Sequence, residues 1–215
     1  MQINIARRIF ETNDRVAQRL RNVFESSGLL VVNVLGSPGA GKTSLIERSL
    51  EYLKDKLRVA VIEGDLATSL DADRLRRFGV PVVQINTGGL CHLDSAMIEN
   101  VLSEFDLPTL DLLIIENVGN LVCPVRFDLG EACKIVVASL PEGDDKVAKY
   151  PTAFSSASVV ILNKIDLENA LNFDMDRFER DLLAVNPAVE MFRVSCCTGI
   201  GLDRWVHWLN QRAAS

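Results

Sequence analysis

The feature that most constrains this chain is a glycine-rich segment, residues 36–43, that follows an apolar run and precedes a helical pattern. It reads Gly-Ser-Pro-Gly-Ala-Gly-Lys-Thr and matches the P-loop, a phosphate-binding motif, in the strand–loop–helix context that this motif requires. Its glycines let backbone N–H groups point at phosphate oxygens. Lys42 is expected to bridge the β- and γ-phosphates, and the Thr43 hydroxyl to ligate Mg²⁺. The residues expected to bind the triphosphate are therefore Gly36, Ser37, Pro38, Gly39, Ala40, Gly41, Lys42, Thr43 and Ser44.

Apolar runs and helical patterns alternate along the rest of the chain. The segments expected to form strands are 29–35, 58–63, 81–85, 111–116, 134–139, 158–162 and 189–194. The helices expected between them are 41–55, 69–78, 92–105, 174–185 and 201–212. Near-continuous apolar strands that alternate with helices are typical of a mainly parallel sheet with helices on both faces. The predicted fold class is therefore α/β, and ligands of such a sheet bind beyond the carboxyl ends of its strands.

An amphipathic helix is expected before the sheet, over residues 3–26. Its apolar residues recur at helical spacing, and Gly28 stands where a helix-ending residue is expected. The helix could pack on the core or on a partner chain. A length of 215 residues suits one ordinary domain. We therefore expect a single nucleotide-binding domain over 1–215, with an N-terminal helix (1–28) and a P-loop core (29–215).

Composition excludes several classes of function. The net charge of −6 and the pI of about 5.0 give the surface no general attraction for nucleic acid or anionic lipid. The longest apolar runs, 28–35 and 112–115, are far shorter than a membrane span, and the N-terminus lacks the apolar core of a signal peptide. Five cysteines without a Cys-x-x-Cys pair argue against a disulfide framework. We expect a soluble, cytoplasmic protein with no nucleic-acid or membrane partner.

Acidic residues end two of the expected strands, where a nucleotide-bound Mg²⁺ needs carboxylate ligands or partners. Asp65 is the better candidate to hold the waters of the metal or to orient an attacking water, whereas Glu63 is interpreted as structural. Glu116 takes the place of a Walker B carboxylate, and Gly119 would let its N–H approach the γ-phosphate. The alternative for each carboxylate is a solvated strand end or a helix N-cap. The expected Mg²⁺ residues are Thr43, Asp65 and Glu116, and the expected catalytic residues are Lys42, Asp65 and Glu116.

A second nucleotide motif, Asn163-Lys164-Ile165-Asp166, follows the strand expected at 158–162. A carboxylate at Asp166 can accept two hydrogen bonds from the N1–H and 2-amino groups of guanine, an edge that adenine does not present. Lys164 can lie along the ring, and Asn163 can brace the loop or meet the base. Ser195 and Cys196 occupy the place of the GTPase loop in which a backbone N–H contacts the guanine oxygen. The motif predicts GTP and GDP as the ligands.

Three soft donors suggest a second kind of site. Cys91 and His92 follow one expected strand, and Cys123 follows another, at the same edge of the sheet. Thiolates and imidazole suit Zn²⁺ and Ni²⁺, and a helix start at Cys91 would favour its thiolate. Three donors leave a tetrahedral ion one short, but two chains related by a two-fold axis would supply six. On spacing alone, buried cysteines and an ordinary loop histidine are an equal alternative.

Taken together, these motifs resemble one family. Cys91-His92-Leu93-Asp94, the stretch Glu-Asn-Val-Gly-Asn-Leu-Val-Cys-Pro over 116–124, and Asn163-Lys164-Ile165-Asp166 look like HypB, the GTPases that help load nickel into nickel–iron hydrogenase. The resemblance covers essentially the whole chain. It implies a P-loop GTPase fold of the signal-recognition-particle/MinD-like (SIMIBI) type, GTP-promoted homodimers, and a nickel or zinc site at Cys91, His92 and Cys123. It also implies work beside the accessory protein HypA, which passes nickel to the hydrogenase large subunit.

Some features depart from that family or leave its details open. Some bacterial members carry an N-terminal Cys-x-x-Cys-Gly-Cys site or a histidine-rich tract, whereas this chain has only two histidines, so nickel storage is not expected. Residues 141–151 are expected to form a polar loop whose lysines either are solvated or reach nucleotide across a dimer. No arginine finger is identifiable, which predicts a slow GTPase. The alternatives are a urease-type nickel GTPase, whose Cys-Pro-His motif is missing here, and a metal-transfer module in which hydrolysis is incidental.

Overall fold

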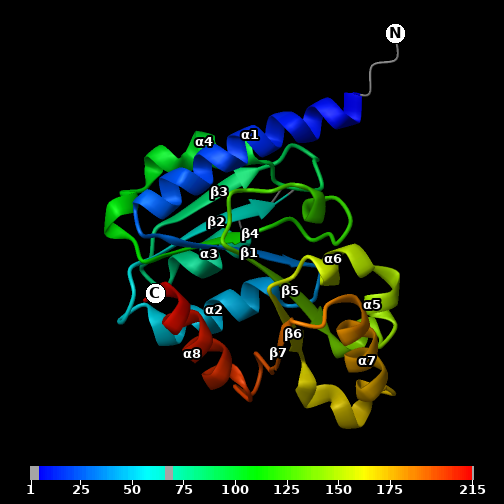
Figure 1. Cartoon of the computed structure of the whole chain (residues 1–215). Coiled ribbons are helices and arrows are strands. Elements are labelled where there is room, and N and C mark those ends of the chain that lie inside the picture. Colours follow the sequence, from blue (N-terminus) through cyan, green and yellow to red (C-terminus); the bar gives the residue numbers. More distant parts are fainter. Residues whose placement is uncertain (1–4, 66–69, 215) are drawn as a thin grey trace.

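Seven parallel strands form one sheet within residues 5–65 and 70–214, the part of the chain that this computed structural model describes (Figure 1). Their order across the sheet is β3-β2-β4-β1-β5-β6-β7, and every neighbouring pair is parallel. The strands are β1 (Leu30–Gly36), β2 (Val59–Asp65), β3 (Val82–Asn86), β4 (Leu112–Glu116), β5 (Cys133–Ser139), β6 (Val159–Asn163) and β7 (Glu190–Arg193). The predicted parallel sheet is confirmed, with each strand within two residues of its expected bounds.

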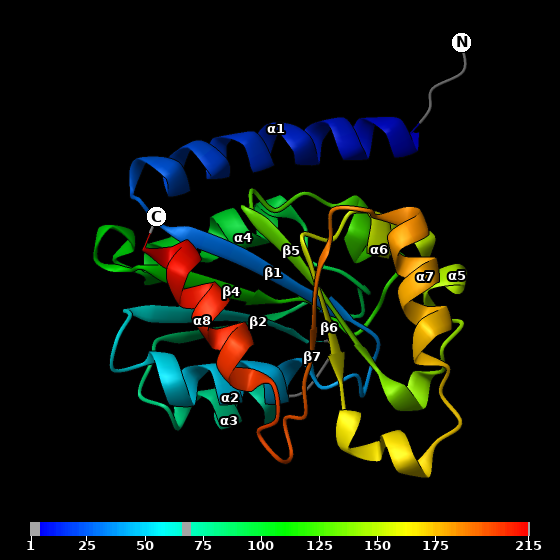
Figure 2. The ribbon, with the colours of Figure 1, turned by 60° about the horizontal axis from the view of Figure 1, so that its bottom comes forward.

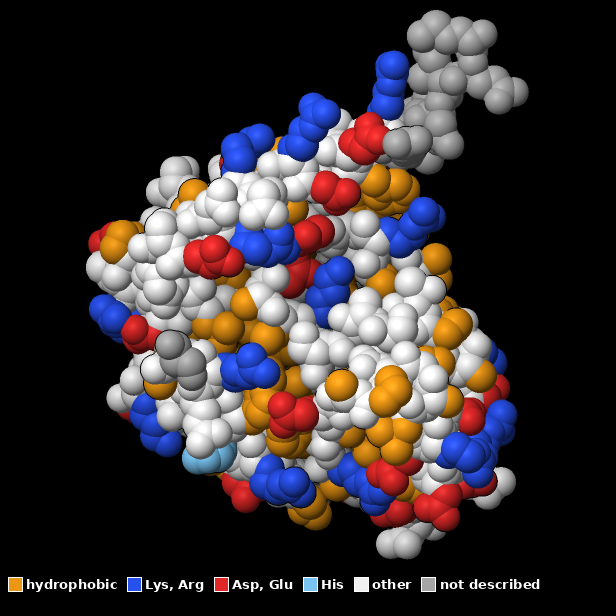
Figure 3. Space-filling view, in the orientation of Figure 1, with side chains coloured by type: hydrophobic (Ala, Val, Ile, Leu, Met, Phe, Trp, Pro, Cys, Tyr) orange, Lys and Arg blue, Asp and Glu red, His pale blue; other side chains and the backbone are white. Residues whose placement is uncertain are grey.

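Helices cover both faces of this sheet. The α-helices are α1 (Ile5–Ser26), α2 (Lys42–Leu53), α3 (Leu70–Arg76), α4 (Ser95–Val101), α5 (Lys146–Lys149), α6 (Pro151–Ser155), α7 (Met175–Val185) and α8 (Leu202–Ala213). Short 3₁₀ turns span Leu102–Glu104, Leu107–Thr109, Pro124–Arg126, Leu140–Glu142 and Ile165–Ala170. None of the described helices is long and apolar enough to cross a membrane. On the face drawn in Figure 3, acidic and basic side chains are intermixed.

Successive side chains along each strand point to opposite faces of the sheet, which divides the core into two layers. On β1, Val32 and Val34 pack with α2, α3 and α8 on one face, around buried Trp205. Val31 and Leu35 point to the other face, where α1 and α4 cover one end and α5, α6 and α7 cover the other. Figure 2 shows α1 and α2 on opposite sides of the sheet. Because all strands run in the same direction, their carboxyl ends and the loops after them meet at one edge.

The N-terminal helix packs on the core of its own chain. Leu20 and Phe24 of α1 are buried against β1, β4 and α4. The helix ends at Ser26, and Gly28 follows it in the left-handed conformation with φ 64°. The expected helix end is therefore confirmed, and of the two expected packing partners the core of the same chain is the one observed.

Three local expectations are corrected by the structure. The helix expected from residue 92 begins only at Ser95, because the Asp94 carboxylate caps it by accepting a hydrogen bond from Met97 N (2.8 Å). Cys91 therefore does not stand at a helix N-terminus. The segment 141–151 is not a plain polar loop, since it contains α5 and the first residue of α6. Of the helix expected at 69–78, α3 covers 70–76, and Ser69 lies outside the described residues.

Candidate functional site

The P-loop lies at the carboxyl end of β1, in the middle of the sheet, and leads directly into α2. Gly41 adopts φ 100°, and a Cβ there would lie 2.3 Å from Asn163 Nδ2, so the loop needs glycine at this position. A cavity of about 470 Å³ opens beside the loop. Ten of the predicted nucleotide residues line it: Pro38, Gly39, Gly41, Lys42, Thr43, Ser44, Asp65, Glu116, Gly119 and Lys164. Gly36, Ser37 and Ala40 complete the loop itself.

Glu116 lines this cavity, and the buried Glu63 is its register partner on β2. Thr43 Oγ1 donates to Glu116 Oε1 (2.8 Å), while Glu116 Oε2 and Glu63 Oε2 are buried with no hydrogen-bond partner. Burial raises the pKa of Glu116 to about 7 despite the nearby Lys42. Burial, and next the charge of Glu116, raises the pKa of Glu63 to about 8. Unpartnered buried carboxylate oxygens beside the Thr43 hydroxyl suit an oxygen-seeking cation, so the residues present fit Mg²⁺.

Two residues at or beside this cavity were not predicted as site residues from the sequence. Glu63 pairs with Glu116 across the β2–β4 register, so it lies next to the predicted Mg²⁺ residues rather than in a purely structural place. Arg74 of α3 lines the same cavity, although no arginine was singled out from the sequence. Its guanidinium is ion-paired with Glu47 (2.5 Å) and Asp71 (2.8 Å). Register and helix packing bring both residues here, and no motif marks either of them.

The Asn-Lys-x-Asp loop is bound directly to the P-loop. Asn163 is buried, and its Nδ2 donates to Ala40 O (3.1 Å). It therefore braces the two loops, which is one of the two roles expected for it. Lys164 Nζ donates to Gly39 O (2.6 Å), which lays its stem between the P-loop and a second cavity of about 290 Å³. The exposed Asp166 lines that cavity. The two cavities share Gly41, Ser44 and Lys164 in their linings, so the predicted phosphate and base residues lie in adjoining cavities.

Cys196 lines this second cavity, and Ser195 is buried beside Asp166. Ser195 Oγ donates to Asp166 Oδ1 (2.5 Å) and holds that carboxylate in place. The Cys196 N–H, expected to meet the guanine oxygen, donates to Asn163 Oδ1 (3.2 Å) in this structure. Burial raises the pKa of the Cys196 thiol to about 11, which leaves it protonated and unreactive at neutral pH. The Cys196 side chain therefore acts as an apolar wall of the cavity.

Lys146 and Lys149 of α5 have different surroundings. Lys146 is buried, and its Nζ donates to Ser37 Oγ of the P-loop (2.7 Å), pairs with Glu142 (2.8 Å) and lies 4.5 Å from the Tyr150 ring centroid. Lys149 is exposed and pairs with Asp145. The lysines of this segment were expected either to be solvated or to reach nucleotide across a dimer. Lys146 does neither, because it is buried and contacts the P-loop of its own chain.

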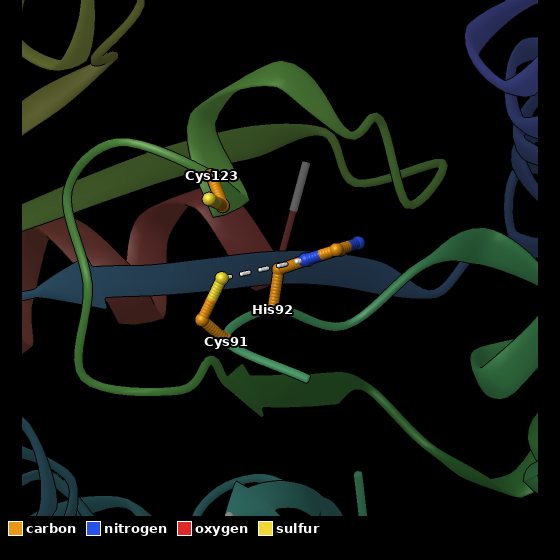
Figure 4. A group of neighbouring side chains, drawn as sticks. All are labelled: Cys91, His92 and Cys123. Atoms are coloured by element: carbon orange, nitrogen blue, oxygen red, sulfur yellow. Dashed lines mark hydrogen bonds between the residues drawn. The ribbon is translucent and has the colours of Figure 1, made fainter. Parts of the chain in front are cut away.

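Cys91, His92 and Cys123 come together, and we call them the Cys/His cluster. Within the described part of the chain they are the one group of three such side chains whose donor atoms all lie within 4.8 Å of one another. Cys91 Sγ lies 3.9 Å from His92 Nδ1. Figure 4 shows the imidazole extending away from the sulfur of Cys123, so Nδ1 is the nitrogen on the side of the thiols. All three side chains are half-buried.

The chemistry of the Cys/His cluster fits a soft divalent ion. Tetrahedral zinc with thiolate and imidazole ligands spaces its donors about 3.5–3.8 Å apart, so a contraction of about 1 Å or less would close the cluster. Burial lowers the pKa of His92, which keeps the imidazole neutral and able to ligate. The hydrogen bond with Cys91, and next burial, raises the pKa of the Cys123 thiol. A metal ion would displace that proton on binding.

One short loop joins the Cys/His cluster to the P-loop, and we call residues 117–123 the linking loop. Asn120 forms an antiparallel backbone bridge with Gly36, and its Nδ2 donates to Cys91 O (3.3 Å). Gly119 packs so closely on Pro38 that a Cβ there would lie 3.0 Å from Pro38 Cγ. Asn117 Oδ1 accepts from Leu93 N (3.1 Å), next to His92. Phosphate-loop and thiol residues therefore contact the same seven-residue segment.

Comparison with known proteins agrees with this arrangement. The family described as CobW/HypB/UreG, nucleotide-binding domain, matches residues 30–193. Hydrogenase maturation factor HypB of Escherichia coli (strain K12) is 46% identical over 207 residues, which cover 96% of this chain and 71% of that protein. HypB from Archaeoglobus fulgidus superposes with a TM-score of 0.88 at 39% identity, covering 94% of this chain and 99% of that one. HypB from Helicobacter pylori in complex with nickel gives a TM-score of 0.88 at 40% identity, covering 94% and 95%.

A more distant likeness concerns the fold alone. Signal recognition particle receptor FtsY from Elizabethkingia anophelis superposes with a TM-score of 0.53 at 15% identity, covering 97% of this chain and 74% of that one. The sheet order and the P-loop define a P-loop nucleotide-binding fold, and this likeness shows that the fold is shared with that receptor. The chain belongs to the HypB hydrogenase maturation factors of the CobW/HypB/UreG family, a nickel-associated GTPase family.

The raised pKa of Glu63 predicts a pH-dependent stability of the protein free of Mg²⁺ and nucleotide. The folded chain keeps this carboxyl protonated up to about pH 8, whereas the unfolded chain ionises it near 4.5. The stabilisation is therefore present below pH 4.5 and is lost as the pH rises through 8. Glu63→Gln, which stays neutral, should raise the unfolding midpoint in urea more at pH 8 than at pH 5.5. Equal shifts at both pH values, or the same effect from the exposed Glu104→Gln, would contradict the assignment.

The contact of Lys146 with Ser37 predicts a role in holding the P-loop ready for phosphate. Lys146→Met should weaken GDP binding about 2- to 10-fold, because one net hydrogen bond contributes about 0.5–1.5 kcal/mol. Isothermal titration with GDP measures this loss. The exposed Lys149→Met serves as the control and should keep wild-type GDP affinity. Equal GDP affinities for Lys146→Met and wild type would show that the contact is incidental.

Proposed function

We propose that this chain is a GTP-binding and GTP-hydrolysing metallochaperone that assists nickel insertion into nickel–iron hydrogenase, with the Cys/His cluster carrying the metal as cargo. The HypB relatives and the nickel complex of one of them support the nickel pathway. The Asn-Lys-x-Asp loop, bound to the P-loop through Asn163 and Lys164, supports guanine nucleotides as the ligands. The single-domain organisation over 1–215 belongs to the same proposal.

The observation that carries the proposal is the position of Asn120. Its backbone bridges Gly36 at the start of the P-loop, its side chain holds the Cys91 carbonyl, and it stands three residues before Cys123. A γ-phosphate that engages the Gly119 N–H has to act on a segment already packed against Pro38. Any resulting shift of the linking loop changes the separation of the two thiols. By linkage, metal binding must then change nucleotide affinity by the same factor.

Hydrolysis follows from the residues around the phosphate cavity. Mg²⁺, when bound, would neutralise charge on the phosphate oxygens, and Thr43, Asp65 and Glu116 are the residues that would hold it or its waters. Lys42 enters the cavity from the first turn of α2 and stabilises negative charge on the transferring phosphoryl group. Asp65 orients the attacking water. Arg74 is already ion-paired to acidic side chains, so it adds little charge stabilisation, and we expect slow turnover.

A homodimer completes this proposal. Three donors leave a metal ion short of ligands, and the half-buried Cys91 and Cys123 can be reached by a second copy. Lys146 contacts its own P-loop, so it is not proposed to reach nucleotide across such a dimer. HypA and the hydrogenase large subunit are the proposed partners, because a carried nickel ion needs both an accessory protein and a destination.

Base selection gives a direct test of the nucleotide assignment. Asp166→Asn should weaken GTP binding about 10- to 100-fold, since a hydrogen bond to a charged group contributes about 1.5–3 kcal/mol. The same change should improve binding of xanthosine triphosphate, whose 2-oxo group replaces the guanine amine. Competition binding with both nucleotides measures the switch. Unchanged GTP affinity would remove Asp166 from the base site.

The metal function is tested by titrating Ni²⁺ and Zn²⁺ into wild type and Cys123→Ala, with GDP and with a non-hydrolysable GTP analogue, while oligomeric mass is recorded. We expect Cys123→Ala to lose the site and the analogue to change both metal affinity and mass. Cys133→Ala, a buried cysteine on β5 outside the cluster, is the matched control. Metal binding that survives Cys123→Ala would refute the shared site. In a separate assay of metal delivery, transfer that is undiminished when the analogue replaces GTP would show that hydrolysis is incidental.

A further inference from the structure

Helix α1 contacts both segments that carry the Cys/His cluster, although it contributes no donor itself. Asn13 is buried in the middle of this contact. Its Nδ2 donates to Asp128 O (2.8 Å), in the segment that follows Cys123, and its Oδ1 accepts from Ser95 N (2.9 Å), just after His92. The Asn13 carbonyl accepts a further bond from Ser95 Oγ (2.8 Å). One side chain thus bridges two segments about thirty residues apart in sequence.

An aromatic stack connects the same helix to the predicted metal ligand. The His92 ring lies on the Phe127 ring with centroids 3.9 Å apart and planes inclined by 21°. Phe127 in turn contacts Phe10 of α1, with centroids 5.3 Å apart. The Arg126 guanidinium lies 4.5 Å from the Phe10 ring centroid and closes the stack from outside. The orientation of the imidazole therefore depends on a side chain of α1.

This contact is held by a few specific interactions rather than by dense packing. A cavity of about 330 Å³ opens between α1 and the start of α4, and Ile9, Asn13, Val16, Asp94 and Phe127 are among its lining residues. Arg21, which forms two 2.8 Å bonds with the Asp128 carboxylate, anchors the helix beyond this cavity. The first half of α1 can therefore shift at little cost in buried surface, while its second half stays on the core.

We propose that helix α1 is a positioning element for the Cys/His cluster: Asn13 and the Phe10–Phe127–His92 stack set the separation of the two ligand-bearing segments, so displacement of α1 opens the site. A metal ion tolerates only a few tenths of an ångström in donor placement, and residues behind its ligands typically change affinity 10- to 100-fold. The nucleotide acts on the cluster from one side through the linking loop, and α1 acts from the other. This inference rests on the metal site of the proposed function.

The test measures metal affinity in the full chain with GDP bound, using chelator competition for Ni²⁺ and Zn²⁺. Asn13→Ala and Phe10→Ala should each weaken binding about 10- to 100-fold. Phe10→Tyr, which keeps a ring, and Gln18→Ala, an exposed change on the same helix, should bind as wild type does. GDP affinity should be unchanged in all four variants. Loss of GDP affinity together with metal affinity would mean general damage and would overturn the positioning role.

A second readout exploits the reciprocity of linkage. If α1 positions the site, Ni²⁺ should slow amide hydrogen exchange of Ser95 and of α1 residues 8–16 in wild type, and this protection should vanish in Asn13→Ala. Wild-type metal affinity in both Asn13→Ala and Phe10→Ala, or exchange in α1 indifferent to metal, would overturn the inference while leaving the metal site intact. Metal binding that is insensitive to Cys123→Ala would instead overturn the proposed site and this inference with it.

Discussion

The antiparallel bridge between Gly36 and Asn120 is the contact on which the rest of this site depends. It places the linking loop so close to the P-loop that a Cβ on Gly119 would lie only 3.0 Å from Pro38 Cγ. The same loop carries Cys123 and, through Asn120, holds Cys91. Because a packed interior does not deform gradually, the proposed coupling requires that a change at the phosphate end also moves the thiol end. The linking loop is the one segment through which that coupling would act.

Two buried carboxyl groups near the phosphate cavity have oxygens without a hydrogen-bond partner. Glu63 and Glu116 each keep an unpartnered oxygen below the phosphate cavity, at a cost that a divalent cation would remove. The Cys/His cluster is likewise close to the arrangement that an ion requires: its donors lie close together but slightly too far apart for one ion. The contacts of α1 with Ser95, Phe127 and Asp128 add a third constraint on that spacing.

Local sequence patterns predicted those parts of the molecule whose chemistry is local. Apolar runs located all seven strands, and the P-loop and Asn-Lys-x-Asp motifs located residues that indeed face common cavities. The patterns failed where a neighbour decided the outcome. Asp94 caps α4 and so removes Cys91 from a helix start. Lys146, expected in a polar loop, is instead buried against the P-loop, and strand register brings Glu63 beside Glu116. Arg74 reaches the cavity only because α3 packs there.

The sequence by itself determined the fold class and the phosphate-binding loop, and it predicted guanine as the base and three soft donors for a metal, because each depends on residue types at short spacings. The tertiary structure alone decided how these parts act on one another. Asn163 joins the base loop to the P-loop, Asn120 joins the P-loop to Cys91, and Asn13 joins α1 to both metal-bearing segments. Asn13 lies in α1, Asn163 ends β6 and Asn120 lies in the linking loop, so no local sequence pattern indicates which partners they have. Their partners are 29 or more residues away in the chain, and only the packing of a parallel sheet with its loops at one edge brings them within hydrogen-bond reach.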